Sequence, residues 1–167
     1  AVATVADVVP LTQENRAIVS LGLELIKEHE GFRSHAYLCP AGKWIIGYGH
    51  TGGVKSGDVI TGIQGETLLR SDIAIAERAV NETGLKLTQN QFDALVSFTF
   101  NVGVGRPRSH RLGPAGFLGS SLLEKARLNT NDPMIHREFM RWVYGAGKVL
   151  SGLVKRRKAE AGLYFSK

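Results

Sequence analysis

The spacing of apolar residues predicts a helix near the start of the chain. Between residues 12 and 30, apolar side chains recur at intervals of three and four, as on one face of an amphipathic helix. Thr12 can cap the first turn, and Gly31 is the glycine that commonly follows the last one. Gly22 lies inside the pattern, so a break into two helices is an alternative. In either case Glu30 is expected in a final helical turn.

Residues 35–62 change from a helical to a β pattern. Residues 39–42 (CPAG) place proline and glycine where a type I turn takes them, and residues 43–50 (KWIIGYGH) then alternate as a strand does. One face carries Trp44, Ile46, Tyr48 and His50, and the other carries Lys43, Ile45, Gly47 and Gly49. The second face is nearly bare after Ile45, which leaves room for a backbone or a ligand. A further short strand over residues 59–61 completes a small antiparallel sheet.

The remainder of the chain is predicted to be helical. A buried stripe indicates a helix over residues 66–80, formed by Leu69, Ile73, Ala76 and Val80. Later helices have recognisable starts: a capping box at Thr88 and Gln91, a serine cap at Ser120 or Ser121, and an Asp132-Pro133 start leading to Phe139, Trp142 and Val143. A last helix covers residues 153–164. The pattern predicts an α+β fold that is mostly helical.

Two segments fall outside this pattern. Residues 103–119 form a long irregular loop with Arg106, Arg108 and Arg111, a candidate for the edge of a cleft to which no role is assigned. Residues 1–15 begin with a short apolar run (AVATVADVVP) that lacks the basic start of a signal peptide. We interpret them as a flexible or trimmed N-terminal segment, with the remnant of an export segment as the alternative. No apolar run reaches the roughly 20 residues that cross a bilayer.

Composition and charge narrow the classes of partner. The 167 residues suit one domain or two small lobes that share a core, and 43% are hydrophobic. A net charge of +6 favours an anionic partner, which composition leaves open between nucleic acid, a membrane surface and the bacterial envelope. Residues 155–158 (KRRK) are either a patch for a polyanion or a solvated basic face. Without a nucleic-acid-binding motif near this run, we expect no nucleic-acid partner.

Glu30 and Cys39 are the candidates for chemistry. A carboxylate at a helix C-terminus faces the negative end of the helix dipole, which disfavours its charged form and suits a general acid. The alternative for Glu30 is a surface residue on an exposed helix end. Cys39 is the only cysteine, so an internal disulfide and a cysteine-based metal site are excluded, and no metal or cofactor is expected. It is a small buried residue, a polar group facing Glu30, or half of a Cys–His pair with His35 or His50.

Several stretches, taken together, resemble the phage-type lysozymes, the endolysins of glycoside hydrolase family 24. They span residues 20–165 and occur in the family's order: IKEHEGFRSHAYLCPAGKWIIGYGHT, GDVIT, TQNQFDALVSFTFNVG, SSLLEKARLN and GLVKRRKAEAGLYF. The resemblance implies hydrolysis of the β-1,4 bond between N-acetylmuramic acid and N-acetylglucosamine in peptidoglycan. It also implies two lobes within a domain of residues 16–167. A small sheet-bearing lobe (30–65) and a helical lobe (85–167) would be joined by a helix over residues 66–82, with the substrate cleft between them.

The resemblance carries roles to individual positions. Glu30 matches the catalytic acid, Cys39 falls where the family has Asp or, in a recurring variant, Cys, and Ile45 falls where the family has Thr. Substrate binding is assigned to Gly47, Tyr48, His50, Asn101 and Arg156. Ile45 departs from the pattern, because it can neither donate nor accept a hydrogen bond to a catalytic water. The loss of one such contact typically costs on the order of 10²-fold in rate.

This departure leaves alternatives to a fully active hydrolase. A weakened enzyme, a module that binds wall glycan without cutting it, and a lytic transglycosylase, which needs no organised water, all remain compatible with the residues. The expected partner is bacterial peptidoglycan, with the outer-membrane surface as a further contact for the basic C-terminal helix. We expect a monomer made in the host cytoplasm that acts in the periplasm and cell wall after export or release through a holin pore.

Overall fold

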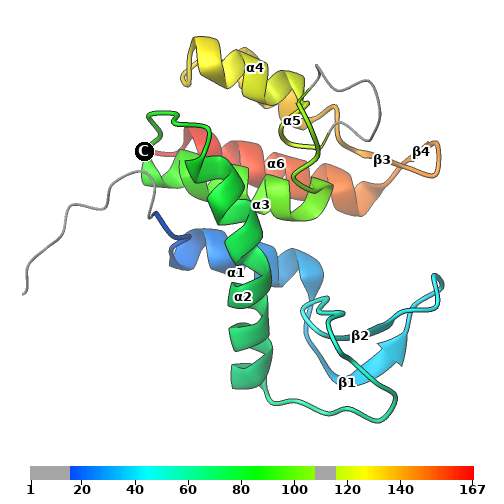
Figure 1. Ribbon diagram of the computed structural model, residues 1–167. Coiled ribbons are helices and arrows are strands. Elements are labelled where there is room, and N and C mark those ends of the chain that lie inside the picture. The colour runs from blue at the N-terminus through cyan, green and yellow to red at the C-terminus, as the bar shows by residue number, and fades with distance from the viewer. Residues whose placement is uncertain (1–15, 108–115) are drawn as a thin grey trace, which may run out of the picture.

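The computed structural model describes residues 16–107 and 116–167, which form six helices and two small hairpins (Figure 1). In chain order the elements are α1 (Ser20–Glu30), β1 (Arg33–Leu38), β2 (Trp44–Gly47), α2 (Gly62–Asn81), α3 (Gln89–Val102), α4 (Ser121–Leu128), α5 (Met134–Phe139), β3 (Tyr144–Gly145), β4 (Lys148–Val149) and α6 (Ser151–Phe165).

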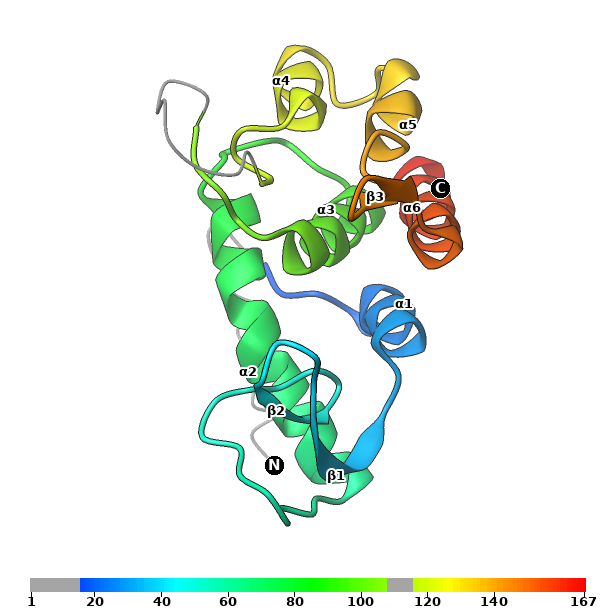
Figure 2. The same ribbon diagram turned by 90° about the vertical axis from the view of Figure 1, so that its right-hand side faces the viewer.

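The elements form a small lobe and a larger helical lobe. The β1–β2 hairpin and the loop after it make the small lobe, and α2 runs from beneath this lobe up into the helical one (Figures 1 and 2). Helix α1 packs against α3 and α6, so its C-terminal end points towards the hairpin. The prediction of a mostly helical α+β fold with two lobes is confirmed.

Helix α3 forms the centre of the hydrophobic core. Each of residues 91–99 is buried, and the helix packs against α1, α2 and α6. The ring of Phe98 meets those of Phe139 and Trp142 edge-on, with centroids 5.4 Å apart in both pairs. Thr88 and Gln91 form the predicted capping box at its start. Over residues 91–99 this helix is buried on every side, as expected of one enclosed by others, although four of the buried residues are polar: Gln91, Asp93, Ser97 and Thr99.

The first helix differs from its prediction. Residues 16–19 are not helical, α1 begins at Ser20, and Thr12 lies outside the described residues. Gly22 does not break the helix but allows a close contact, because a Cβ on it would lie 2.7 Å from Cβ of Asp93 on α3. The turn before α1 is held by other helices: Glu77 accepts a hydrogen bond from the N–H of Ile18 at 2.8 Å.

The sheet is smaller than predicted. In β1–β2, Tyr37 is opposite Ile45 and Leu38 is opposite Trp44, whereas residues 59–61 form only a bridge between Val59 and His35. The predicted alternation over residues 43–50 ends at Gly47, whose φ of +64° turns the chain out of the strand.

Beyond α3, the observed starts of the helices match the predicted starts more closely than the observed ends match the predicted ends. Ser120 caps α4, and Asp132 accepts a hydrogen bond from the N–H of Met134 at the start of α5. Helix α5 ends at Phe139, so Trp142 and Val143 follow it instead of lying within it. The β3–β4 hairpin was not predicted, because its two-residue strands are too short to produce an alternating pattern.

Candidate active site

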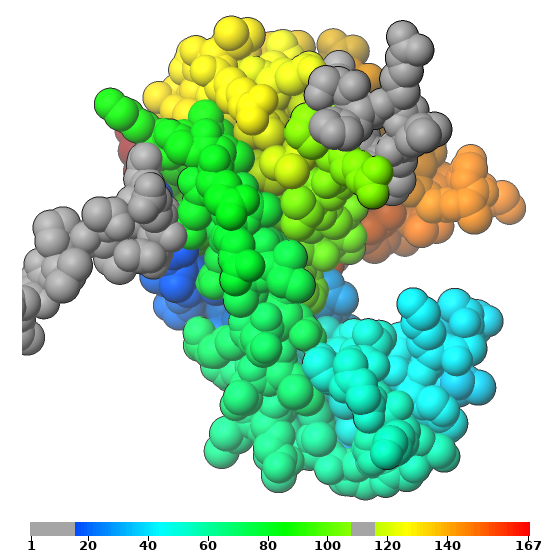
Figure 3. Space-filling model, viewed as in Figure 1, coloured from blue at the N-terminus to red at the C-terminus, as the bar shows by residue number. Residues whose placement is uncertain are grey.

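A groove separates the small lobe from the helical lobe on the face shown in Figure 3. Within it, a pocket of about 490 Å³ lies between the C-terminal end of α1 and the N-terminal end of α6. Its lining comes from α1, α3 and the start of α6: His29, Glu30, Asn101, Leu150, Ser151, Gly152, Leu153 and Arg156. The pocket therefore unites three residues predicted to form the site, Glu30, Asn101 and Arg156.

Glu30 is held by an ion pair across the pocket. Its Oε1 atom lies 2.5 Å from Nη1 of Arg156, and 24% of its side chain is exposed against 4% for the arginine. A side chain on Gly49 would begin 3.8 Å from the other carboxylate oxygen, so the backbone after β2 passes close to that oxygen. The carboxylate is thus fixed on one side and open to the groove on the other.

Arg156 belongs to a buried network that anchors the site. Its Nε atom lies 3.1 Å from Oε1 of Glu160, and Oγ of Ser97 donates to the same oxygen at 2.7 Å. Arg157 approaches the other Glu160 oxygen at 3.0 Å and donates to Oδ1 of Asn101 at 2.7 Å. Burial raises the pKa of Glu160 and lowers that of Arg157 to about 10. One arginine thus orients the catalytic candidate, and the other orients Asn101.

The basic run on α6 is therefore not a uniform surface. Arg156 and Arg157 are buried, whereas Lys155 and Lys158 are exposed. Lys155 pairs with Glu28 at 3.1 Å. Neither sequence-based alternative, a patch or a solvated face, described the buried half of this run. Helical periodicity over four residues does not show which of them face a buried carboxylate.

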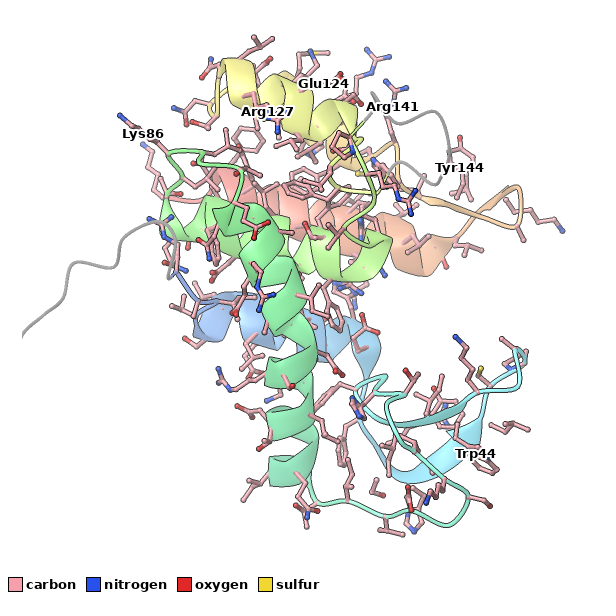
Figure 4. All side chains as sticks on the ribbon, viewed as in Figure 1. Trp44, Lys86, Glu124, Arg127, Arg141 and Tyr144 are labelled. Carbon is pink, nitrogen blue, oxygen red and sulfur yellow. The ribbon has the colours of Figure 1, made fainter. Side chains whose placement is uncertain are left out.

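Cys39 and Ile45 lie on the hairpin across the groove. Cys39 is half-buried in the turn, where its N–H donates to the carbonyl of Lys43 at 2.9 Å. Ile45 is paired with Tyr37, and Figure 4 shows the neighbouring Trp44 on the side of the hairpin turned away from the helical lobe. Because strand side chains alternate, Ile45 is on the side that faces the groove.

No Cys–His pair forms among the described residues. Cys39 makes no hydrogen bond to His35, to His50 or to Glu30 there. His35 contacts Oγ of Ser34 at 2.9 Å instead. His50 joins the loop after β2 to α2, with Nδ1 2.8 Å from Oδ2 of Asp72 and Nε2 3.0 Å from the carbonyl of Gly52.

Two other predicted binding residues lie outside the Glu30 pocket. Tyr48 lines a second hollow of about 690 Å³ beside α1, where its ring centroid is 5.3 Å from that of Phe32. Gly47 is buried at the end of β2, and a Cβ there would lie 3.2 Å from Ile60. These residues shape the small lobe, as His50 does. His29 and Ser151 also line the pocket but were not predicted as site residues: His29 lies within the stretch that resembles the family but has no role there, and Ser151 belongs to no recognised motif.

Neither a metal-binding cluster nor a membrane-spanning helix occurs in residues 16–107 and 116–167. They contain no group of three His, Cys, Asp or Glu side chains placed to hold a metal ion. Nor do they contain a helix both long enough and apolar enough to span a membrane.

Comparison with known proteins identifies the family. The family model described as phage lysozyme matches residues 27–160. The chain belongs to the phage lysozyme family. An endolysin of Acyrthosiphon pisum secondary endosymbiont phage 1 is 44% identical over 151 residues, covering 87% of this chain and 95% of the relative.

Solved structures agree with this assignment. The muramidase domain of SpmX from Asticaccaulis excentricus is 35% identical with a TM-score of 0.78, covering 91% of this chain and 99% of that one. The endolysin from Escherichia coli O157:H7 phage FAHEc1 is 33% identical with a TM-score of 0.76, and the match covers 90% of this chain and 94% of the endolysin chain. This phage lysozyme family member is accordingly a glycoside hydrolase that acts on peptidoglycan.

Proposed function

We propose that this phage lysozyme family member hydrolyses the β-1,4 bond between N-acetylmuramic acid and N-acetylglucosamine, with Glu30 as general acid. The observation that carries the proposal is the position of Glu30, fixed by Arg156 at the end of α1 and open to the groove. In this step Glu30 donates a proton to the glycosidic oxygen as the bond to the anomeric carbon breaks. Water adds to that carbon, and the proton it releases passes to solvent, from which Glu30 is protonated again.

The residues available to activate the attacking water differ from those of a typical inverting glycosidase. Inverting glycosidases place a second carboxylate across the sugar to activate the water. Here the hairpin offers the thiol of Cys39 and the aliphatic side chain of Ile45. We assign Cys39 to the water on the hairpin side, with Ile45 forming an apolar wall beside it. The names endolysin and muramidase among the relatives favour hydrolysis over a module that only binds glycan.

Replacement of Glu30 by glutamine tests the proposal. Glu30→Gln keeps the size of the side chain but has no acidic proton, so we expect a loss of at least about 10²-fold in the release of reducing ends from purified peptidoglycan. Glu28→Gln is the matched control, because Glu28 lies on the same helix and pairs with the exposed Lys155. Near-parental activity of a folded Glu30→Gln variant would contradict the assignment.

Finer assignments of partner and location belong to the same proposal. We expect a monomer that reaches the wall after export or holin-mediated release. Contact with an outer membrane would use Lys155 and Lys158, since the two arginines between them are buried. Part of the substrate-binding set would act through the shape of the loop after β2: Gly47, Tyr48 and His50. The other two residues, Asn101 and Arg156, would contact the substrate within the pocket.

A further inference from the structure

His29 is a polar residue of the Glu30 pocket with no part in the mechanism above. It precedes Glu30 on α1, lines the same pocket and is half-buried. Its ring makes no hydrogen bond with any part of the protein that the structure describes, in contrast to His35 and His50, which both have partners. An imidazole beside a catalytic acid thus keeps both ring nitrogens available to a ligand.

The surroundings of His29 keep its ring uncharged at neutral pH. Burial lowers the pKa of His29 below its ordinary 6.5, and the charge of Arg156 acts in the same direction. Lys155 and Arg157 add smaller effects of the same sign, and Glu28 opposes them. A neutral imidazole has one N–H donor and one acceptor nitrogen. It therefore complements a group that carries both an acceptor and a donor.

The other residues that line the pocket likewise combine hydrogen-bonding groups with apolar side chains. Oδ1 of Asn101 is occupied by Arg157, while its amide nitrogen has no hydrogen-bond partner among the described residues. Ser151 adds a hydroxyl at the start of α6, where Leu150 provides no side-chain cap for the first N–H groups. Leu150 and Leu153 supply apolar walls. The set suits a small group with a carbonyl, an N–H and a methyl.

We propose that the pocket is the subsite for an acylamino substituent of the sugar next to the scissile bond, with His29 hydrogen-bonding its amide. The inference rests on the proposed function, because both sugars of that substrate carry N-acetyl groups. The volume of about 490 Å³ is within the range of small-ligand sites. Because Glu30 lines the same pocket, a substituent held there also orients the glycosidic oxygen towards the acid.

The test compares purified peptidoglycan with the same material after chemical de-N-acetylation and again after re-N-acetylation. Release of reducing ends gives kcat and KM for the parent protein and for His29→Phe, which fills the space but cannot hydrogen-bond. We expect His29→Phe to raise KM about 3- to 10-fold on the acetylated wall, the effect of one lost hydrogen bond. Its KM on the de-N-acetylated wall should match the parent's. The parent's preference for acetylated over de-N-acetylated wall, measured as the ratio of the two KM values, should therefore disappear in His29→Phe.

Further variants keep the inference falsifiable. His29→Gln, which retains a donor and an acceptor, should recover most of the preference, and His136→Ala, on an exposed face of α5, should leave it unchanged. A folded His29→Phe protein with the parental preference, or with equal losses on both substrates, would overturn the subsite. If the parent itself released no reducing ends, the proposed function would fail together with the subsite. A failure confined to the His29 variants would remove the subsite alone.

Discussion

At the residue scale, the proposed function makes position 45 the place where a contact to the attacking water is expected to be missing. Ile45 is paired with Tyr37, the alternation of strand side chains places it on the side of the hairpin opposite Trp44, and its side chain offers no hydrogen bond. The thiol at position 39 is the other group that the hairpin contributes. A hydroxyl at position 45 would add both a donor and an acceptor beside that thiol.

Ile45→Thr is therefore expected to raise the rate of peptidoglycan hydrolysis, on the order of 10- to 10²-fold if the hydroxyl orders the water. Initial rates on purified wall measure the effect. Ile45→Val is the matched control, because valine has the shape of threonine without its hydroxyl. Equal rates for the Thr and Val variants would show that another group positions the water.

Asp93 links pH to stability. Burial is the main reason that its pKa is raised from 3.8 to about 6, although Gln89 donates to it at 2.7 Å. A folded-state pKa above the unfolded value means that protonation favours the folded chain. This contribution is fully present below pH 3.8 and is lost as the pH rises through about 6.

We expect Asp93→Asn to be more stable than the parent at pH 8, by on the order of 1–3 kcal/mol. The advantage should shrink as the pH falls towards 4, where the parent carboxyl is neutral. Urea unfolding of both proteins across this range measures it. A difference that does not change with pH would show that Asp93 does not titrate as its burial implies.

At the scale of elements, the contact between α1 and α3 places Glu30, the proposed general acid. Gly22 lets the two helices approach, and the ion pair of Arg156 ties the end of α1 to α6. Glu30 thus reaches the groove because two later helices hold its own helix. A small change in the α1–α3 distance would move the carboxylate relative to the hairpin.

Gly22→Ala tests this contact. Its Cβ would lie 2.6 Å from Cγ1 of Ile18 and 2.7 Å from Cβ of Asp93, so we expect a destabilisation of about 1–3 kcal/mol despite the higher helix propensity of alanine. Gly162→Ala, on α6 with nothing within 4 Å of the added atom, is the control and should stabilise slightly. Equal thermal midpoints for the two variants would contradict the close packing.

At the scale of the whole molecule, we expect the net charge to influence the encounter with the wall. The net charge of +6 attracts anionic polymers, and salt screens this attraction over about 10 Å at 0.1 M. Part of the basic run is buried in the network around Glu160, so within residues 155–158 only the two lysines are exposed.

Lysis of wall material should therefore slow as salt is raised at constant pH. Lys158→Glu, a change at an exposed position, should reduce the salt dependence by lowering the net charge to +4, from +6 minus 2. Turbidity loss at several salt concentrations measures both slopes. If the lysis rates of parent and variant fell equally with salt concentration, Lys158 would play no part in the encounter with the wall.

Much of the fold and part of the site could be predicted from the sequence alone. Periodicity predicted the stripe on α2 from Leu69 to Val80, and local hydrogen-bonding chemistry predicted the capping box of Thr88 and Gln91. The position of Glu30 before Gly31 followed from the same short-range rules. These features depend on residues within about one helical turn of each other, which is the range over which sequence patterns are informative.

Tertiary structure alone decided the rest. Glu30 and Arg156 are 126 residues apart, and no local pattern shows that they meet. Helix packing over long separations also decides that Arg157 is buried, that His29 lines the pocket and that Tyr48 lies in a different hollow. The sequence thus determined the family, the helices and the catalytic candidate. Packing decided which side chains surround that candidate, because the contacts of a buried polar group are set by every element that covers it.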